Sequence, residues 1–309
     1  MPILKHCSKL FLSVLTAGAL SAACGSSEDP STPGQYVVDD IFIPNNAVAS
    51  AIDLNGDGTN DNNVGTILNT LGSLAGIDIQ SAITDDINNG ATILLVRVEA
   101  DSFSNDDTIT AEVLRGQNAN PAACAGEDDT ECGNHLNGGA SFDLQAGASQ
   151  GTPLQGSVDR SDMLVGPGQA SIDISFSMAG DSLELNLELA TLSGMLRAAE
   201  INDGIIGGAI TEADMQNSLI PQVVVTLNEA VALDCALDPA AGCCDSATST
   251  GAQVLAFLNK NDDCVLSLEE VRDDPNVQSL LTPDIDLSGN GTEDAFSLGL
   301  GFSAVGANF

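Results

Sequence analysis

Large aromatic side chains are almost missing from this sequence. It contains no Trp, a single Tyr (Tyr36), and only 3% aromatic residues in total. Proteins that bind carbohydrates or stacked nucleic-acid bases need flat aromatic faces, so this shortage weighs against both classes of binding protein.

Basic residues are also scarce. The chain has 8 Lys and Arg residues against 44 Asp and Glu residues, which gives a formal net charge of −36. Such a surface repels nucleic acid and anionic membrane surfaces and attracts cations, so we expect no nucleic-acid partner. The 43% hydrophobic content nevertheless indicates a folded chain with its own core.

Two familiar catalytic motifs are missing, the His-Glu-x-x-His motif and the Gly-rich phosphate-binding loop with a Lys. His135 is the only His after the first 23 residues, and a His in such a polar loop is far more often a turn residue than a catalyst. We therefore predict no enzymatic activity. A hydrolase that uses a pair of carboxylates stays open as an alternative, because acidic residues are abundant.

Residues 1–23 have the pattern of a signal peptide. Lys5 and Lys9 form a short basic segment, and an apolar run follows over 10–20. This run is well below the roughly 20 residues that a membrane-spanning helix needs. The signal peptide places the mature chain outside the cytoplasm, where disulfides form.

The sequence Leu-Ser-Ala-Ala-Cys at 20–24 resembles the lipobox of bacterial lipoproteins. The resemblance implies that Cys24 is lipidated and anchors the chain to a membrane, and Gly25 in place of Asp implies the outer membrane. Ser21 stands where the lipobox usually has Leu, so ordinary secretion with cleavage after a nearby Ala is the alternative. Residues 24–36, which are mostly small and polar, are predicted to be a flexible tether.

Six cysteines remain after the signal peptide and the lipobox Cys are set aside, which predicts three disulfides. Cys124 and Cys132 bracket a short acidic loop and are expected to pair. The other four form a second group, Cys235, Cys243, Cys244 and Cys264. Adjacent cysteines rarely pair, so each of the two adjacent ones should reach one of the others, in an order that stays open. A zinc site is disfavoured, because its cysteines need tighter pairing and a reducing compartment.

Hydrophobic periodicity predicts an α+β fold, beginning with an antiparallel β-rich domain over 37–210. Helices are expected first, at 63–75 and 80–89. Strands are then expected at 92–99, 108–114, 141–145, 191–198 and 204–210. The clearest pattern is the alternation of apolar and polar residues on both sides of 179–182, which predicts a hairpin. Residues 146–169 are Gly-rich and are expected to form a loop.

A helical, disulfide-rich, EF-hand-like region is predicted over 211–309. Thr211 and Asp214 have the spacing of a capping box, and a helix is expected from there to about 233, broken or kinked at Pro221. Residues 295–305 alternate strongly and are expected to rejoin the sheet as a terminal strand.

A short Asp- and Gly-rich segment occurs twice, once near each end of the mature chain. In the first copy, which we call the first loop, oxygens are available at five positions, Asp53, Asn55, Asp57, Thr59 and Asp61. Alternating oxygens around a Gly turn are how a chain wraps calcium. Val64 stands where an EF-hand has Glu, so this loop resembles the short loops of dockerin- and thrombospondin-like repeats. A turn without metal is the alternative.

The second copy, the last loop, offers fewer carboxylates. Its candidate ligands are Asp286, Ser288, Asn290, Thr292 and Asp294. An offset frame that starts at Asp284 also fits the pattern. Because the two copies lie far apart in the chain, we interpret them as two separate local calcium clips.

A third candidate, the middle loop, has the length of an EF-hand loop. Its candidate ligands are Asn259, Asn261, Asp263, Val265, Ser267 and Glu270. Cys264 replaces the usual Gly at position 6 and must therefore adopt positive φ at some cost. A disulfide at this Cys can hold the turn, so the loop is either a stapled calcium site or a relic in which the staple replaced the ion.

The order of these parts resembles a set of uncharacterised acidic bacterial lipoproteins. The matching segments are 53–62, the small 124–132 loop, 203–210, and 286–292 with 298–302. The resemblance implies a surface location and EF-hand-like calcium loops, and it brings no activity with it.

We therefore expect a calcium-binding, lipid-anchored cell-envelope protein in which calcium is structural. Its partner would be an unknown protein or envelope component, and it would act as a surface binding or scaffold protein. The alternatives are the carboxylate-pair hydrolase and a structural lipoprotein whose turns bind no metal.

Overall fold

The computed structural model describes residues 33–44, 47–75, 78–126, 129, 132–145, 152–175, 182–237, 250–261 and 263–309. The predicted signal peptide, Cys24 and most of the predicted tether lie outside the described residues. None of the helices in the described part of the chain has the length and apolar character required to span a bilayer.

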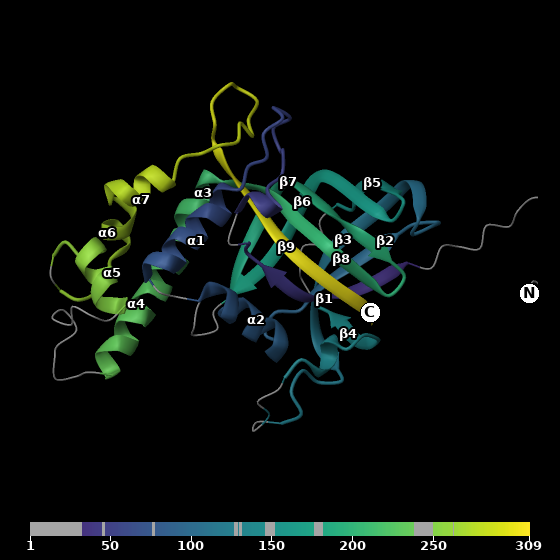
Figure 1. Ribbon diagram of the computed structural model, residues 1–309, viewed down its shortest axis with the longest axis horizontal. Helices are drawn as coiled ribbons and strands as arrows, with labels where there is room; N and C mark the ends of the chain where they lie inside the picture. The colour runs from purple at the N-terminus through teal and green to yellow at the C-terminus, as the bar shows by residue number, and fades with distance from the viewer. Residues whose placement is uncertain are drawn as a thin grey trace, which may run out of the picture. The chain divides into compact units, whose positions relative to one another are not determined.

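Strands in the described part of the chain join into one closed sheet (Figure 1). They are β1 (Gly34–Phe42), β2 (Leu94–Glu99), β3 (Asn105–Asn120), β4 (Ala140–Leu144), β5 (Leu154–Asp159), β6 (Asp162–Ser175), β7 (Ser182–Arg197), β8 (Glu200–Thr211) and β9 (Ala295–Asn308). Eight pair antiparallel in the ring β1-β2-β3-β5-β6-β7-β8-β9, which closes where β9 pairs with β1. The remaining strand, β4, pairs with β3 and with the end of β9.

The predicted α+β class with an EF-hand-like second region is therefore wrong, because the fold is a mostly β barrel. Residues 295–305 do rejoin the sheet as a strand, as their alternation predicts. In the structure β9 lies between β8 and β1 and makes the closure itself. The first strand also begins at Gly34, so it takes in residues 34–36, which were assigned to the tether.

The expected loop at 146–169 is also wrong, because β5 and most of β6 fall within it. Val158 and Met163, on opposite sides of the turn, are buried. The turn uses Arg160 and Ser161, both at positive φ (51° and 71°). Two-residue hairpins with this geometry usually carry Asn-Gly or Asp-Gly, so the sequence lacked the usual signal.

The interior of the barrel is filled by side chains, as expected for a ring of eight strands. Tyr36, Leu185 and Phe302 are at most 2% exposed. The Tyr36 hydroxyl donates to the Arg197 carbonyl at 2.8 Å, and burial raises the pKa of this phenol far above its usual value. The core is thus apolar, with its one large phenol hydrogen-bonded.

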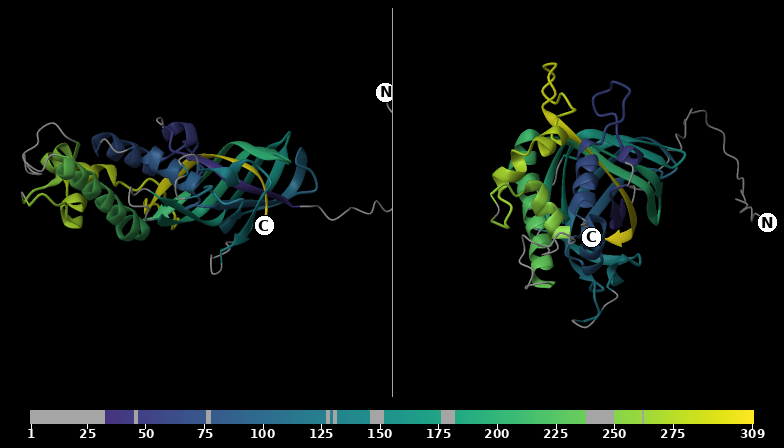
Figure 2. Two further views of the ribbon diagram at one scale, coloured as in Figure 1. Left: turned by 90° about the horizontal axis from the view of Figure 1, so that it is seen from below. Right: turned by 60° about the vertical axis from the view of Figure 1, so that its left-hand side comes forward.

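Helices pack beside the barrel and share its core (Figure 2). They are η1 (Ala47–Ser50), α1 (Asn63–Ala75), α2 (Ile79–Asn89), η2 (Asn134–Leu136), α3 (Glu212–Asp214), η3 (Met215–Leu219), α4 (Ile220–Leu237), α5 (Thr250–Leu258), α6 (Leu268–Arg272) and α7 (Pro275–Leu280). The bounds predicted for α1 are confirmed. Val254, Leu266 and Val277, from the predicted EF-hand-like region, belong to the same apolar cluster as the barrel interior.

The predicted capping box at the start of this helical segment is half confirmed. The Thr211 hydroxyl accepts from the Asp214 N–H, and the Asp214 carboxylate accepts from the same hydroxyl. The expected break at Pro221 is replaced by the π-helical turn η3, which ends one residue before α4 begins. Pro221 therefore lies in the first turn of α4, directly after the π-helical turn.

Small residues on the outer side of β9 allow other segments to approach it closely. Phe296, Leu298, Leu300 and Phe302 point into the core, and Gly299 lies between two of them. A Cβ built on Gly299 would lie 1.9 Å from the Ser50 carbonyl oxygen. This glycine is therefore required for η1 to pack on the closing strand.

Replacing Gly299 by Ala should lower the free energy of unfolding by about 2 kcal/mol, because the new methyl group must push η1 away from β9. Urea denaturation checks this. Gly306→Ala is the matched control on the same strand, since a Cβ there meets its nearest neighbour at an ordinary 3.4 Å. Equal stability of the two variants would contradict this account of β9.

Candidate functional site

The first loop is closed at its base and ordered by its own side chains. Ile52 and Asp61 exchange two backbone hydrogen bonds of 3.2 and 3.1 Å. The Asp53 carboxylate accepts from the N–H groups of Gly56 and Gly58 at 2.7 and 3.0 Å. Both glycines have positive φ (76° and 85°), so the loop turns at the positions that the sequence predicts.

The next two candidate ligands of this loop also accept hydrogen bonds from backbone N–H groups of the loop. Asn55 accepts from the Asp57 N–H at 3.0 Å, and Asp57 accepts from the Thr59 N–H at 2.6 Å. The bond from Thr59 holds the pKa of Asp57 below its ordinary value. The oxygens at positions 1, 3 and 5 are therefore held against the backbone of the loop, each with a lone pair left over.

The last loop repeats this arrangement on the chain segment before β9. The Asp286 carboxylate accepts from the N–H groups of Asn290 and Gly291 at 3.0 and 2.6 Å. Asn290 accepts from the Thr292 N–H at 2.8 Å. Asp294, at position 9, accepts from the second residue of the loop. The Ser288 hydroxyl donates to the Asp286 carboxylate at 3.5 Å, and hydrogen bonding from Ser288 lowers the pKa of Asp294.

The offset frame for the last loop is not favoured. The Asp284 carboxylate accepts from both the N–H and the hydroxyl of Ser297, on β9. The Ser297 hydroxyl in turn accepts from the Asn63 N–H, at the start of α1. Asp284 therefore serves as a structural link between the last loop, the closing strand and the first helix.

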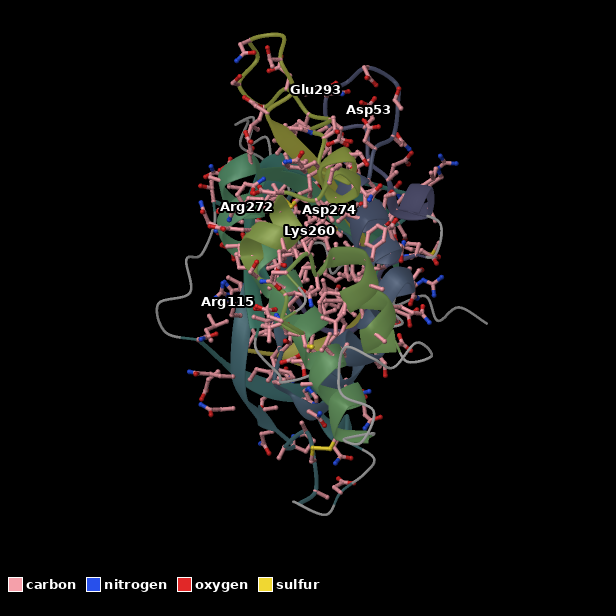
Figure 3. The ribbon with its side chains drawn as sticks, turned by 90° about the vertical axis from the view of Figure 1, so that its left-hand side faces the viewer. Asp53, Arg115, Lys260, Arg272, Asp274 and Glu293 are labelled. Carbon is pink, nitrogen blue, oxygen red and sulfur yellow. A yellow bond between two sulfur atoms is a disulfide. The ribbon has the colours of Figure 1, made fainter. Side chains whose placement is uncertain are left out.

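The first and last loops lie side by side, although the sequence analysis interpreted them as two separate clips (Figures 1 and 2). Asp53 and Glu293 mark the two loops in Figure 3. Partial burial raises the pKa of Asp61, and four carboxylates of the two loops raise it further, those of Asp284, Asp57, Asp53 and Glu293. The fold thus concentrates negative charge at the tip of the molecule formed by the first and last loops.

A buried polar junction fixes the first loop to β9. The Asn62 side chain donates to the Gly299 carbonyl at 2.8 Å and accepts from the Gly299 N–H at 3.0 Å. It also accepts from the Gly65 N–H at the start of α1 and donates to the Ser50 hydroxyl. Asn62 and Ser50 are 7% and 1% exposed, and Gly65 and Gly299 are buried, so the junction sets the base of the loop firmly.

The middle loop has the predicted turn geometry. Asn261 accepts from the Asp263 N–H at 3.1 Å, and Asp263 accepts from the Val265 N–H at 3.0 Å. Cys264 has a φ of 66°, the left-handed conformation that this position of the loop requires. Cys264 is also disulfide-bonded, as the stapled-turn interpretation expects.

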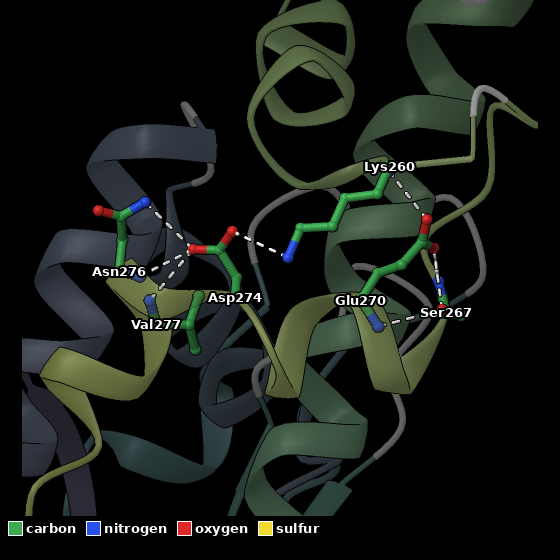
Figure 4. A network of polar contacts seen from close by, with 6 residues as sticks. All are labelled: Lys260, Ser267, Glu270, Asp274, Asn276 and Val277. Atoms are coloured by element: carbon green, nitrogen blue, oxygen red, sulfur yellow. Dashed lines mark hydrogen bonds and ion pairs between the residues drawn. The ribbon is translucent and has the colours of Figure 1, made fainter.

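Glu270, the last candidate ligand of this loop, closes it onto α6 (Figure 4). One carboxylate oxygen accepts from the Lys260 N–H at 2.9 Å, and the other from the N–H and hydroxyl of Ser267. The Ser267 hydroxyl oxygen accepts from the Glu270 N–H, which completes a capping box. These hydrogen bonds, from Ser267 first, lower the pKa of Glu270, so it is ionised at neutral pH.

The middle loop is also fastened to its surroundings on two sides. The Lys260 ammonium lies 3.3 Å from the Asp274 carboxylate, whose side chain is 6% exposed and caps α7. The side-chain amide of Asn228, on α4, donates to the Leu266 carbonyl and accepts from its N–H. The loop therefore keeps its shape without a second loop paired against it.

Asn259, the first candidate ligand of the middle loop, differs from the hydrogen-bonded ligands described above. The Oδ1 atom of Asn259 is buried and has no hydrogen-bond partner among the described residues. A buried oxygen left without a partner costs about 1–3 kcal/mol. This oxygen stands at position 1 of the loop, where a calcium ligand would be.

The donor set of all three loops fits a hard cation, because it consists of carboxylate, amide, hydroxyl and carbonyl oxygens. In the part of the chain that the structure describes, no three His, Cys, Asp or Glu side chains are grouped so that they could hold a metal ion. The three Asp side chains of the first loop are therefore not gathered around one point, and the candidate sets of the loops also include Asn, Ser and backbone oxygens, which such a grouping does not count.

One of the predicted disulfides is confirmed in full. Cys124 and Cys132 are bonded with an S–S distance of 2.01 Å. The partner of Cys264 and the pairing of Cys235, Cys243 and Cys244 fall outside the described residues and remain predictions.

His135 is buried rather than exposed in a polar turn. It is 0% exposed, packs edge-on against Phe142, and makes no hydrogen bond of normal geometry through its ring within the described structure. Burial lowers the pKa of its imidazole, and the nearby Ile87 carbonyl offsets part of that shift. A neutral, enclosed ring of this kind packs as part of the core and is not available to a substrate.

A Gly-x-Ser-x-Gly pattern occurs at 147–151, so the expectation that the sequence has no such pattern is wrong. It falls outside the described residues. In a serine-hydrolase nucleophile elbow this pattern precedes a helix, whereas the next element here is the strand β5. The flanking structure therefore does not match that motif.

Comparison with protein-family models, curated proteins and solved structures produced no match to this chain.

Because burial lowers the pKa of His135, its protonation at low pH should destabilise the fold. The unfolded chain binds this proton near the ordinary pKa of about 6.5, so stability is complete above that pH and falls as pH decreases through it. Melting temperatures between pH 7.5 and 5.5 should therefore fall more for the wild type than for His135→Phe. If the melting temperatures of the two proteins changed with pH in parallel, the conclusion that His135 is a buried neutral ring would be contradicted.

Proposed function

We propose that this chain is a calcium-binding, lipid-anchored protein of the bacterial envelope, in which calcium braces loops at the surface. The observation that supports the calcium part is the buried Oδ1 of Asn259, which has no hydrogen-bond partner among the described residues. It belongs to a loop in which Asn261 and Glu270 accept hydrogen bonds from the loop backbone. A calcium ion would supply the partner that this oxygen lacks. The lipid anchor at Cys24 rests on the lipobox resemblance alone.

The first and last loops are proposed as further sites of the same kind. Their side-chain oxygens at positions 1 and 5 are held by backbone N–H groups, so little ordering remains to be done when an ion binds. The charge gathered at their tip favours a divalent cation, since a bound ion would relieve the repulsion around Asp61.

The proposed ions have a structural role. Sites in extracellular modules typically bind calcium with Kd of about 10⁻⁴–10⁻³ M. At a calcium concentration of about 100 times Kd, one site stabilises the fold by about 2.7 kcal/mol. The protein would then be a rigid surface binding or scaffold protein, with a protein or envelope component as its partner.

Calcium titration by calorimetry tests this proposal. The wild type should bind calcium, and Glu270→Gln and Asp57→Ala should each remove about one site, because each loses a carboxylate of a different loop. Matched controls are Glu269→Gln, an exposed neighbour on α6, and Asp85→Ala, an exposed residue of α2. Absence of binding heat, together with a melting temperature that is unchanged by a chelator, would refute the calcium proposal and favour metal-free turns.

Variants of Asn259 test whether the middle loop binds calcium or is a relic in which the disulfide has replaced the ion. Asn259→Leu removes the unpartnered oxygen and should raise the free energy of unfolding without calcium by about 1–3 kcal/mol, while it abolishes binding at the middle loop. Asn259→Asp should tighten calcium binding at that loop by adding a charge. If neither variant changes the titration, the middle loop is a stapled turn that no longer binds the ion.

A further inference from the structure

An apolar groove lies between four helices on the side of the middle loop. Its volume is about 330 Å³. Leu227 of α4, Val254 and Phe257 of α5, and Leu280 of α7 contribute apolar walls, and Thr70 of α1 lies at one side. The groove is separate from the candidate ligands of the three loops.

The walls of the groove are suited to an apolar body. Leu227 and Val254 are 3% and 4% exposed and belong to the main core, so the floor is rigid and apolar. Phe257 stands out at the opening, where 45% of it is exposed. An occupant would cover this ring. Removing apolar surface from water favours binding by roughly 25 cal/mol for each Å².

The uncharged lining of the groove disfavours a charged ligand. Among the described residues that line it, the polar side chains are all neutral, namely Thr70, Gln253, Asn276 and Ser279. An anion would find no counter-ion here and would be repelled by the net charge of −36. A cation would have to lose its hydration against apolar walls.

The neutral groups can still fix the orientation of a ligand. The hydroxyls of Thr70 and Ser279 donate to carbonyls of their own helices, at 2.8 and 2.7 Å, and keep lone pairs that can accept. The exposed amide of Gln253 offers both a donor and an acceptor. An apolar pocket with a few neutral polar groups is the usual form of a small-molecule site, and its volume lies at the small end of the range.

We propose that this groove binds a small uncharged molecule with an apolar body and a single hydroxyl or amide group, such as a medium-chain alcohol. This proposal does not depend on calcium binding.

The test uses the full mature chain carrying Cys24→Ser, so that neither lipid nor detergent competes for the probe. The neutral fluorophore N-phenyl-1-naphthylamine should bind saturably, and 1-decanol should displace it at least tenfold more effectively than decanoate at pH 8. The two competitors have the same chain length and differ in charge. The ratio of the concentrations at which they displace the probe therefore measures the selectivity of the groove for an uncharged ligand.

Two variants locate the site. Ser279→Trp should fill the groove and weaken probe binding at least tenfold, whereas Gln278→Trp, on the exposed neighbour in α7, should leave it unchanged. If Ser279→Trp lowers the melting temperature, Phe257→Ala serves instead, with at least threefold weaker binding expected from the loss of a wall. The proposal is overturned by non-saturable probe binding, by equal displacement with decanoate, or by variants that bind as tightly as the wild type.

Discussion

The pairing of β9 with β1 is the interaction on which the rest of this structure depends. It closes eight strands into a ring, buries Phe296 and Phe302 in the interior, and removes two exposed sheet edges at once. The outer side of the same strand is made of Gly and Ser, and these residues receive η1 and the start of α1. One strand therefore forms the barrel and also positions the two Asp loops.

The two kinds of candidate site are supported differently. The first and last loops extend from the barrel and are tied to β9 through Asn62 and Asp284, so the barrel sets their position. The middle loop depends on helices, since Asn228 of α4 and Asp274 before α7 hold it. A change in the helical layer should therefore affect the middle loop and leave the other two in place.

The sequence predicted local structure well and global structure poorly. The positive φ of Cys264 and the positions of the turn glycines followed from loop spacing, because a short turn leaves few backbone conformations. The closed barrel did not follow, since closure depends on pairing between β1 and β9, which local periodicity does not encode. The β5–β6 hairpin was missed because Arg160 and Ser161 occupy a turn that usually contains Gly. The burial of His135 and the isolation of the Asn259 oxygen depend on residues distant in sequence, so neither was predictable from the sequence.

The position of β9 in the chain has a consequence for how this protein folds. Its partners β1 and β8 come much earlier in the sequence, so both present unpaired backbone edges until the closing strand arrives. Such non-local pairing slows folding, and exposed edges invite pairing between chains. A chain of this topology would be most prone to aggregate just before its last strand is available. A high density of negative charge is a physical means of keeping neighbouring chains apart during that interval.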